Sequence, residues 1–202
     1  MFEGCSNLKS IDKIDVKKVG IKGFSSMFYN CSSLVNIPSI LPATELESYC
    51  YQQMFKGCTS LVTAPELPAT TLETSCYNAM FSSCNSLVQS PELPATTLAP
   101  SCYYDMFNSC ISLTQAPSIL PATTLANECY SNMFNSCSSL TQAPELPATT
   151  LGYACCNAMF RNCTSLTQAP SILPATTLAE NCYSYMFFGC RSLERAPYLP
   201  AS

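Results

Sequence analysis

The sequence predicts an α/β solenoid, a stack of coils of 26 or 27 residues in which each coil is a short parallel strand followed by a helix. The first observation is a repeat that runs the length of the chain. Eight methionines are each followed directly by phenylalanine and, four residues after the methionine, by cysteine. The second observation is that the two halves of each repeat have different apolar periods. A fixed period of this size is typical of solenoids, in which each coil buries its apolar face against its neighbours.

The first half of a coil predicts a strand. In the coil of residues 113–139, Leu113 and Ala116 flank two polar residues, which suits a strand of three or four residues. Pro117 has no N–H to give to a ladder and should end the strand. Strands repeated in this way would form one continuous parallel sheet along the stack.

The second half of the same coil predicts a helix of three to four turns. Its apolar residues recur at offsets of 0, 4, 8, 9 and 12, which is one helical face. They are Leu125, Cys129, Met133, Phe134 and Cys137. Threonines precede this segment in most coils, and Thr70 with Glu73 has the spacing of a capping box at the helix start. We expect the recurring leucine, cysteine, methionine and phenylalanine to form a shared interior.

The chain divides into two parts. Residues 1–26 form a divergent N-terminal coil that lacks the Pro-Ala-Thr-Thr block and is interpreted as a partial cap. Residues 27–202 form the solenoid, about six full coils, truncated at the C-terminus. Because the chain begins and ends inside a repeat, it suggests an excerpt of a longer protein.

Composition excludes several classes of function. Charged residues are 11% and hydrophobic residues 48% of the chain, with a net charge of −4, which argues against disorder and nucleic-acid binding. No apolar run approaches the ~18–20 residues of a spanning helix, so no membrane insertion is expected in this segment. The chain has no histidine and no glycine-rich phosphate loop. We therefore expect no enzyme, no cofactor and no metal site.

The fifteen cysteines favour buried thiols over disulfides or metal ligands. Two positions eight apart on a helix are separated by about 12 Å, beyond the reach of a disulfide. One or two disulfides between coils remain the alternative. Cys156 replaces the tyrosine of the other coils and is the thiol most open to exposure or reaction, unless the replacement has no function.

The predicted binding surface is the polar stripe of the strands. The alternative is that this stripe is a solvated sheet surface without a partner. The glutamates of the bends, such as Glu66, are interpreted as solubilising charges. The stripe residues are Asn36, Thr63, Gln89, Thr114, Gln115, Thr141, Gln142, Thr167, Gln168 and Arg195.

The block Met106-Phe107-Asn108-Ser109-Cys110-Ile111-Ser112-Leu113 resembles the bacterial-surface 26-residue repeat. The chain also resembles the BspA-type leucine-rich repeat in the order of Leu140, Ala143, Pro144, Phe160 and Cys163. The resemblance implies a right-handed solenoid in a cell-surface protein that attaches to host or microbial partners. It carries over no functional residues.

These observations together predict a non-enzymatic recognition or adhesion module, extracellular or on the cell surface, that binds a protein or glycan partner through a repeat-built face. The alternative is a structural spacer or assembly element, including one from a phage or a surface appendage, that associates end to end with itself.

Overall fold

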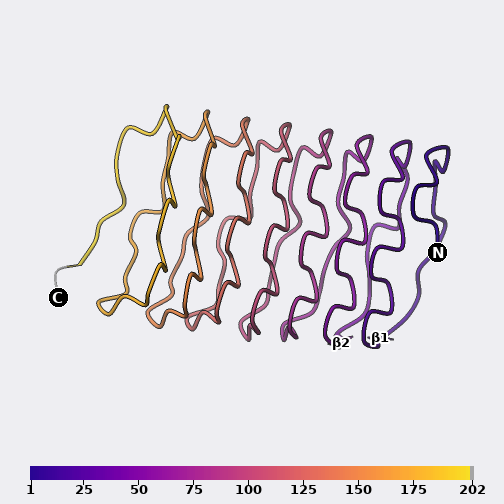
Figure 1. Ribbon diagram of the computed structural model, residues 1–202, viewed down its shortest axis with the longest axis horizontal. Helices are drawn as coiled ribbons and strands as arrows, with labels where there is room; N and C mark the ends of the chain where they lie inside the picture. Colours follow the sequence, from indigo (N-terminus) through magenta and orange to yellow (C-terminus); the bar gives the residue numbers. More distant parts are fainter. Residues whose placement is uncertain (201–202) are drawn as a thin grey trace.

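The computed structural model describes residues 1–200. The chain winds through successive coils that lie side by side along the long axis of the molecule (Figure 1). The earliest coil, in indigo, lies at one end of the stack and the coil that includes residues 175–190 lies at the other. Residues 26 or 27 apart in the sequence therefore occupy equivalent places in neighbouring coils.

Strand pairing between the coils is parallel and very short. β1 (Lys18–Val19) pairs with β2 (Glu45–Leu46), with Lys18 opposite Glu45 and Val19 opposite Leu46. Elsewhere in residues 1–200 the coils are joined by isolated parallel bridges, such as Gln89 with Gln115. The strands of three or four residues expected in every coil are thus reduced to single bridges. Pro91 and Pro117, two residues after these glutamines, have no N–H to extend a ladder.

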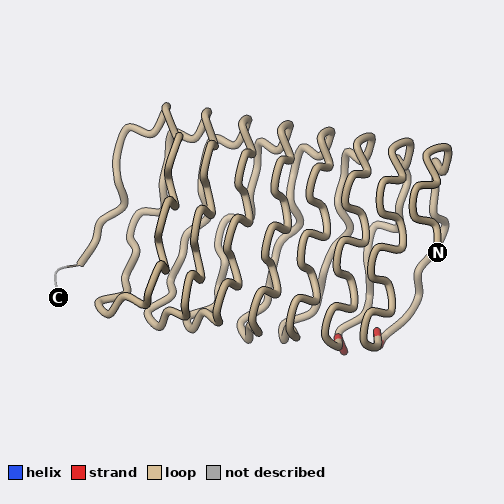
Figure 2. The backbone as a smooth tube through the Cα atoms, viewed as in Figure 1, coloured by secondary structure: helices blue, strands red, loops and turns tan. Residues whose placement is uncertain are grey.

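The predicted helix in each coil is wrong, and with it the α/β fold class. Residues 1–200 contain no helix (Figure 2). In the segment 128–137 the backbone amides instead alternate between two kinds of partner. Met133 N–H donates to the Tyr130 carbonyl three residues earlier, at 3.1 Å, whereas Phe134 N–H donates to the Met159 carbonyl of the next coil, at 2.9 Å. Every amide of this segment can be satisfied in this way without a helix.

The left-handed backbone conformation of every fourth residue is what prevents the helix. Glu128, Asn132 and Ser136 have φ of 56°, 54° and 62°. Each is the third residue of a β-turn, a position at which type II turns require positive φ, and a residue with positive φ interrupts a right-handed helix. The segment is therefore a row of tight turns, and the capping box expected at Thr70 and Glu73 has no helix to cap.

The expected shared interior is confirmed. In one central coil Cys102, Met106, Phe107, Cys110 and Leu113 are all fully buried. Phenylalanines of neighbouring coils stack with ring centroids 5.5 to 5.7 Å apart, from Phe2 through to Phe187. A second row stacks the tyrosines from Tyr51 to Tyr130 at 5.7 to 5.9 Å. The repeat thus builds two continuous aromatic columns inside the stack.

The cysteines form part of this interior as free thiols. In one column each thiol donates to the carbonyl of the preceding coil's phenylalanine, as Cys84 does to Phe55 at 3.2 Å. Cys156, the expected exposed or reactive thiol, is fully buried instead, because it continues the buried row of tyrosines. Burial raises the pKa of the Cys110 thiol to about 12, so the thiols of this column stay protonated at neutral pH.

Candidate binding groove

The polar stripe lies where each coil leaves the row of turns and enters its proline-rich half. All ten stripe residues are exposed. Backbone bridges align several of them across neighbouring coils. Thr63 pairs with Gln89, Gln89 with Gln115, and Gln142 with Gln168, whereas Asn36 pairs with Ser10. The side chains of the stripe therefore recur at the spacing between coils.

Three hollows lie along this stripe, with volumes of about 450, 400 and 750 Å³. Gln89 and Glu92 line both the first and the second of them, and Gln142 lines both the second and the third. The hollows therefore lie next to one another in a row from Thr63 to Tyr198, and we call this row the groove. Nine of the ten stripe residues line this groove, and Asn36 does not.

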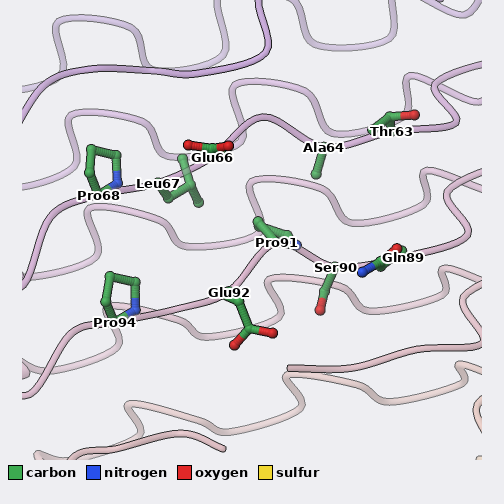
Figure 3. A pocket seen from close by; sticks show the side chains of 10 residues that line it. All are labelled: Thr63, Ala64, Glu66, Leu67, Pro68, Gln89, Ser90, Pro91, Glu92 and Pro94. Atoms are coloured by element: carbon green, nitrogen blue, oxygen red, sulfur yellow. The ribbon is translucent and has the colours of Figure 1, made fainter. Parts of the chain in front are cut away.

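Figure 3 shows how two adjacent coils build one end of the groove. Thr63 and Gln89 lie at equivalent places in the two segments, as do Glu66 and Glu92 farther along. Pro68 and Pro94 lie side by side at the far end. The hollow is lined by both coils, so a ligand seated in it would contact two repeats at once.

The glutamine amides are the groups of the stripe most available to a ligand. Within residues 1–200, the side chains of Gln89, Gln115, Gln142 and Gln168 make no hydrogen bond to other protein groups. The threonines differ among themselves, since Thr167 Oγ1 already donates to the Thr141 carbonyl at 3.1 Å. An amide offers both a donor and an acceptor, so this row can recognise hydroxyl groups or a peptide backbone.

The groove also contains the glutamates of the bends, which the sequence did not place beside the stripe, and a buried hydroxyl. Glu66, Glu92 and Glu145 line it, and Arg195 is the only basic residue among the described lining residues. The Glu145 carboxylate accepts from the Ser171 hydroxyl at 2.7 Å and from the Ser171 N–H at 3.1 Å. This glutamate therefore ties two coils together, a contact that its interpretation as a solubilising charge did not include.

Ser90 lines the first hollow, together with Glu66, and occupies a position where most other coils have alanine. Its side chain is almost completely buried, and its Oγ has no hydrogen-bond partner among the described residues. The fixed position of the glutamates and the serine in place of alanine were both visible in the sequence. Neither indicated a groove, because a hollow between coils depends on how two repeats stack.

Residues 1–200 contain no group of three or more His, Cys, Asp or Glu side chains that could hold a metal ion. The same residues form no helix with the length and apolar character that a membrane span needs.

Comparisons of the chain with protein-family models, with curated proteins and with solved structures found no match.

Proposed function

We propose that this chain is a non-enzymatic recognition module that binds a protein or glycan partner in the groove along the stripe. The observation that carries the proposal is the row of three adjacent hollows, which share lining residues and repeat the same polar side chains. A surface built from repeats in this way suits an extended partner that presents its own repeated groups.

The chemistry of the groove supports a polar partner. Unpaired glutamine amides can hydrogen-bond to sugar hydroxyls or to a peptide backbone, and the prolines give the groove a rigid apolar lining. The resemblance to bacterial surface repeats supports a place outside the cell or on its surface. Attachment to a host or microbial partner is the role that fits both features.

The test is binding to defined probes, namely immobilised mucin, immobilised fibronectin and a panel of pure oligosaccharides. The groove variant carries Gln89→Ala, Gln115→Ala and Gln142→Ala together. Each lost hydrogen bond is worth about 0.5–1.5 kcal/mol. We therefore expect the Kd for a bound probe to rise roughly tenfold or more.

A matched control variant carries Thr96→Ala, Thr123→Ala and Thr149→Ala. These threonines are exposed, lie in the same region of the stack and line none of the three hollows. The control should bind as the original chain does. Equal binding by the groove variant, or weaker binding by the control alone, contradicts the proposal, as does the absence of binding to every probe.

A further inference from the structure

The interior holds an unusual number of reactive groups that the proposed recognition does not use. All fifteen cysteines are free, and thirteen of them are buried. Cys5 is exposed and Cys190 is partly exposed. A chain so rich in thiols has many sites for oxidation whenever it is unfolded, so the state of these thiols bears directly on whether the fold can form.

The packing around the thiols leaves no room for an adduct. Cys84 is fully buried, and its Sγ lies 3.2 Å from the Phe55 carbonyl oxygen to which it donates. Cys110 makes the same bond to Phe81, at 3.1 Å, and Cys137 to Phe107, also at 3.1 Å. These carbonyls belong to the stacked phenylalanines, so each thiol is held against the aromatic column of the preceding coil.

We infer that only the reduced chain reaches this fold, and that folding then withdraws the buried thiols from soluble oxidants. An oxidant therefore prevents the unfolded chain from folding and has little effect on the folded protein. The inference stands independently of the proposed function, because it concerns the interior of the stack and no residue of the groove.

The reaction that prevents folding is thiol–disulfide exchange with oxidised glutathione. A cysteine thiolate of the unfolded chain attacks one sulfur of the glutathione disulfide, and a new S–S bond joins the chain to one glutathione. The other glutathione leaves as a thiolate, so the chain sulfur is oxidised and the leaving sulfur is reduced. At Cys84 the product has no S–H to donate to Phe55 and adds a tripeptide inside a close-packed interior.

In the folded protein the same reaction is opposed twice. The buried sulfur is out of reach, and burial raises the pKa of thiols such as Cys58 and Cys110 to about 12, so the reactive thiolate is scarce. Cys5 has neither protection from solvent nor a carbonyl partner among the described residues. It should therefore be the fast-reacting thiol of the native protein.

The first measurement follows thiol reaction with a chromogenic aromatic disulfide at neutral pH. The native protein should show fast reaction at Cys5, and this phase should vanish in Cys5→Ser. The buried thiols should react at least roughly a thousandfold more slowly, because a folded domain is open for only about 10⁻³ of the time or less. In denaturant all fifteen thiols should react together. Comparable rates at Cys5 and at the buried thiols of the native protein would overturn the inference.

The second measurement tests refolding. Chain unfolded in denaturant with excess oxidised glutathione should fail to regain its native circular dichroism on dilution, and a reductant added to the same sample should restore it. The matched control is protein alkylated while native, so that only surface thiols are blocked, then unfolded with reductant and refolded. It should refold fully. Recovery of native structure by the glutathione-modified chain would contradict the inference that only the reduced chain folds.

Discussion

The two sides of each coil are held together by different interactions. On the side of the turns, alternate amides bond to the next coil, as Asn132 N–H does to the Asn157 carbonyl, and the buried aromatic rings stack beneath them. On the groove side the coils meet through isolated bridges, and prolines such as Pro91 and Pro94 have no N–H to offer.

This difference explains where the repeat can vary. The coils of 26 and 27 residues differ by one residue in the proline-rich half, where some copies read Ser-Ile-Leu-Pro and others Glu-Leu-Pro. The parallel bridge of Ile40 with Glu66 joins two such unequal segments, as does that of Ile119 with Glu145. The side of the turns has a fixed length from coil to coil, so it sets the repeat while the groove side tolerates change.

The largest effect that would expose this difference is alkaline unfolding. Burial raises the pKa of Cys58, Cys102 and Cys110 to about 12, above the ordinary value of 9.0. A raised thiol pKa stabilises the fold below the ordinary pKa, and this stability is lost as the pH rises toward the folded value. Each such thiol costs about 1.4 kcal/mol per pH unit in that window. Urea midpoints should therefore fall steeply between pH 9 and about 12.

Cys58, Cys102 and Cys110 should add no slope to the same titration between pH 6 and 8, where all three are protonated in both states. Urea midpoints that stay constant up to pH 12 would show that the turn-side interior does not depend on its neutral thiols.

A truncation in the aromatic column should have the next largest effect. Phe107 is fully buried between Phe81 and Phe134, with ring centroids 5.6 and 5.5 Å away. Phe107→Ala removes the ring that stacks on both neighbours and leaves a cavity, so we expect a loss of about 3–5 kcal/mol in the free energy of unfolding. Urea denaturation followed by circular dichroism measures it. A loss below about 1 kcal/mol would mean that the stack is not held by this column.

The sequence predicted which residues are buried but not the backbone that buries them. Leu125, Cys129, Met133 and Cys137 are spaced by four without exception, and at 3.6 residues per turn each such step rotates by about 40° around a helix. An amphipathic helix mixes steps of three and four. Over twelve residues the two patterns look alike, and we interpreted a row of four-residue turns as a helix.

The turn conformation had only a weak signal in the sequence. Asn132 and Ser136 tolerate positive φ in turns, but Glu128 and Ala158 also have positive φ at the third position of a turn and give no such indication. Hydrogen bonds to the next coil decide the backbone there. In the groove, the exposed stripe could be predicted from alternation, whereas Glu92 and Ser90 could not be placed beside it, because the hollows form only between stacked coils.

A smaller effect should come from relieving the backbone on the side of the turns. Ala158 has φ of 51°, a conformation that disfavours residues with a Cβ. Ala158→Gly should raise the free energy of unfolding by up to about 1 kcal/mol, because glycine adopts this conformation freely and the gain exceeds its extra entropy in the unfolded chain. Ala143, buried on the groove side and without positive φ, supplies the control. Ala143→Gly should destabilise, and a destabilised Ala158→Gly would contradict the turn geometry.

The smallest effect on stability should come from the groove itself. Gln115 is exposed and its amide has no partner among the described residues, so Gln115→Ala should change the free energy of unfolding by no more than about 0.5 kcal/mol. Compared with Phe107→Ala, this substitution separates the side that holds the stack from the side offered to a partner. Its urea midpoint should match the original chain while binding to a probe weakens. A large loss of stability from Gln115→Ala would show instead that the glutamine row is part of the frame, and the groove would then be a by-product of how the coils stack.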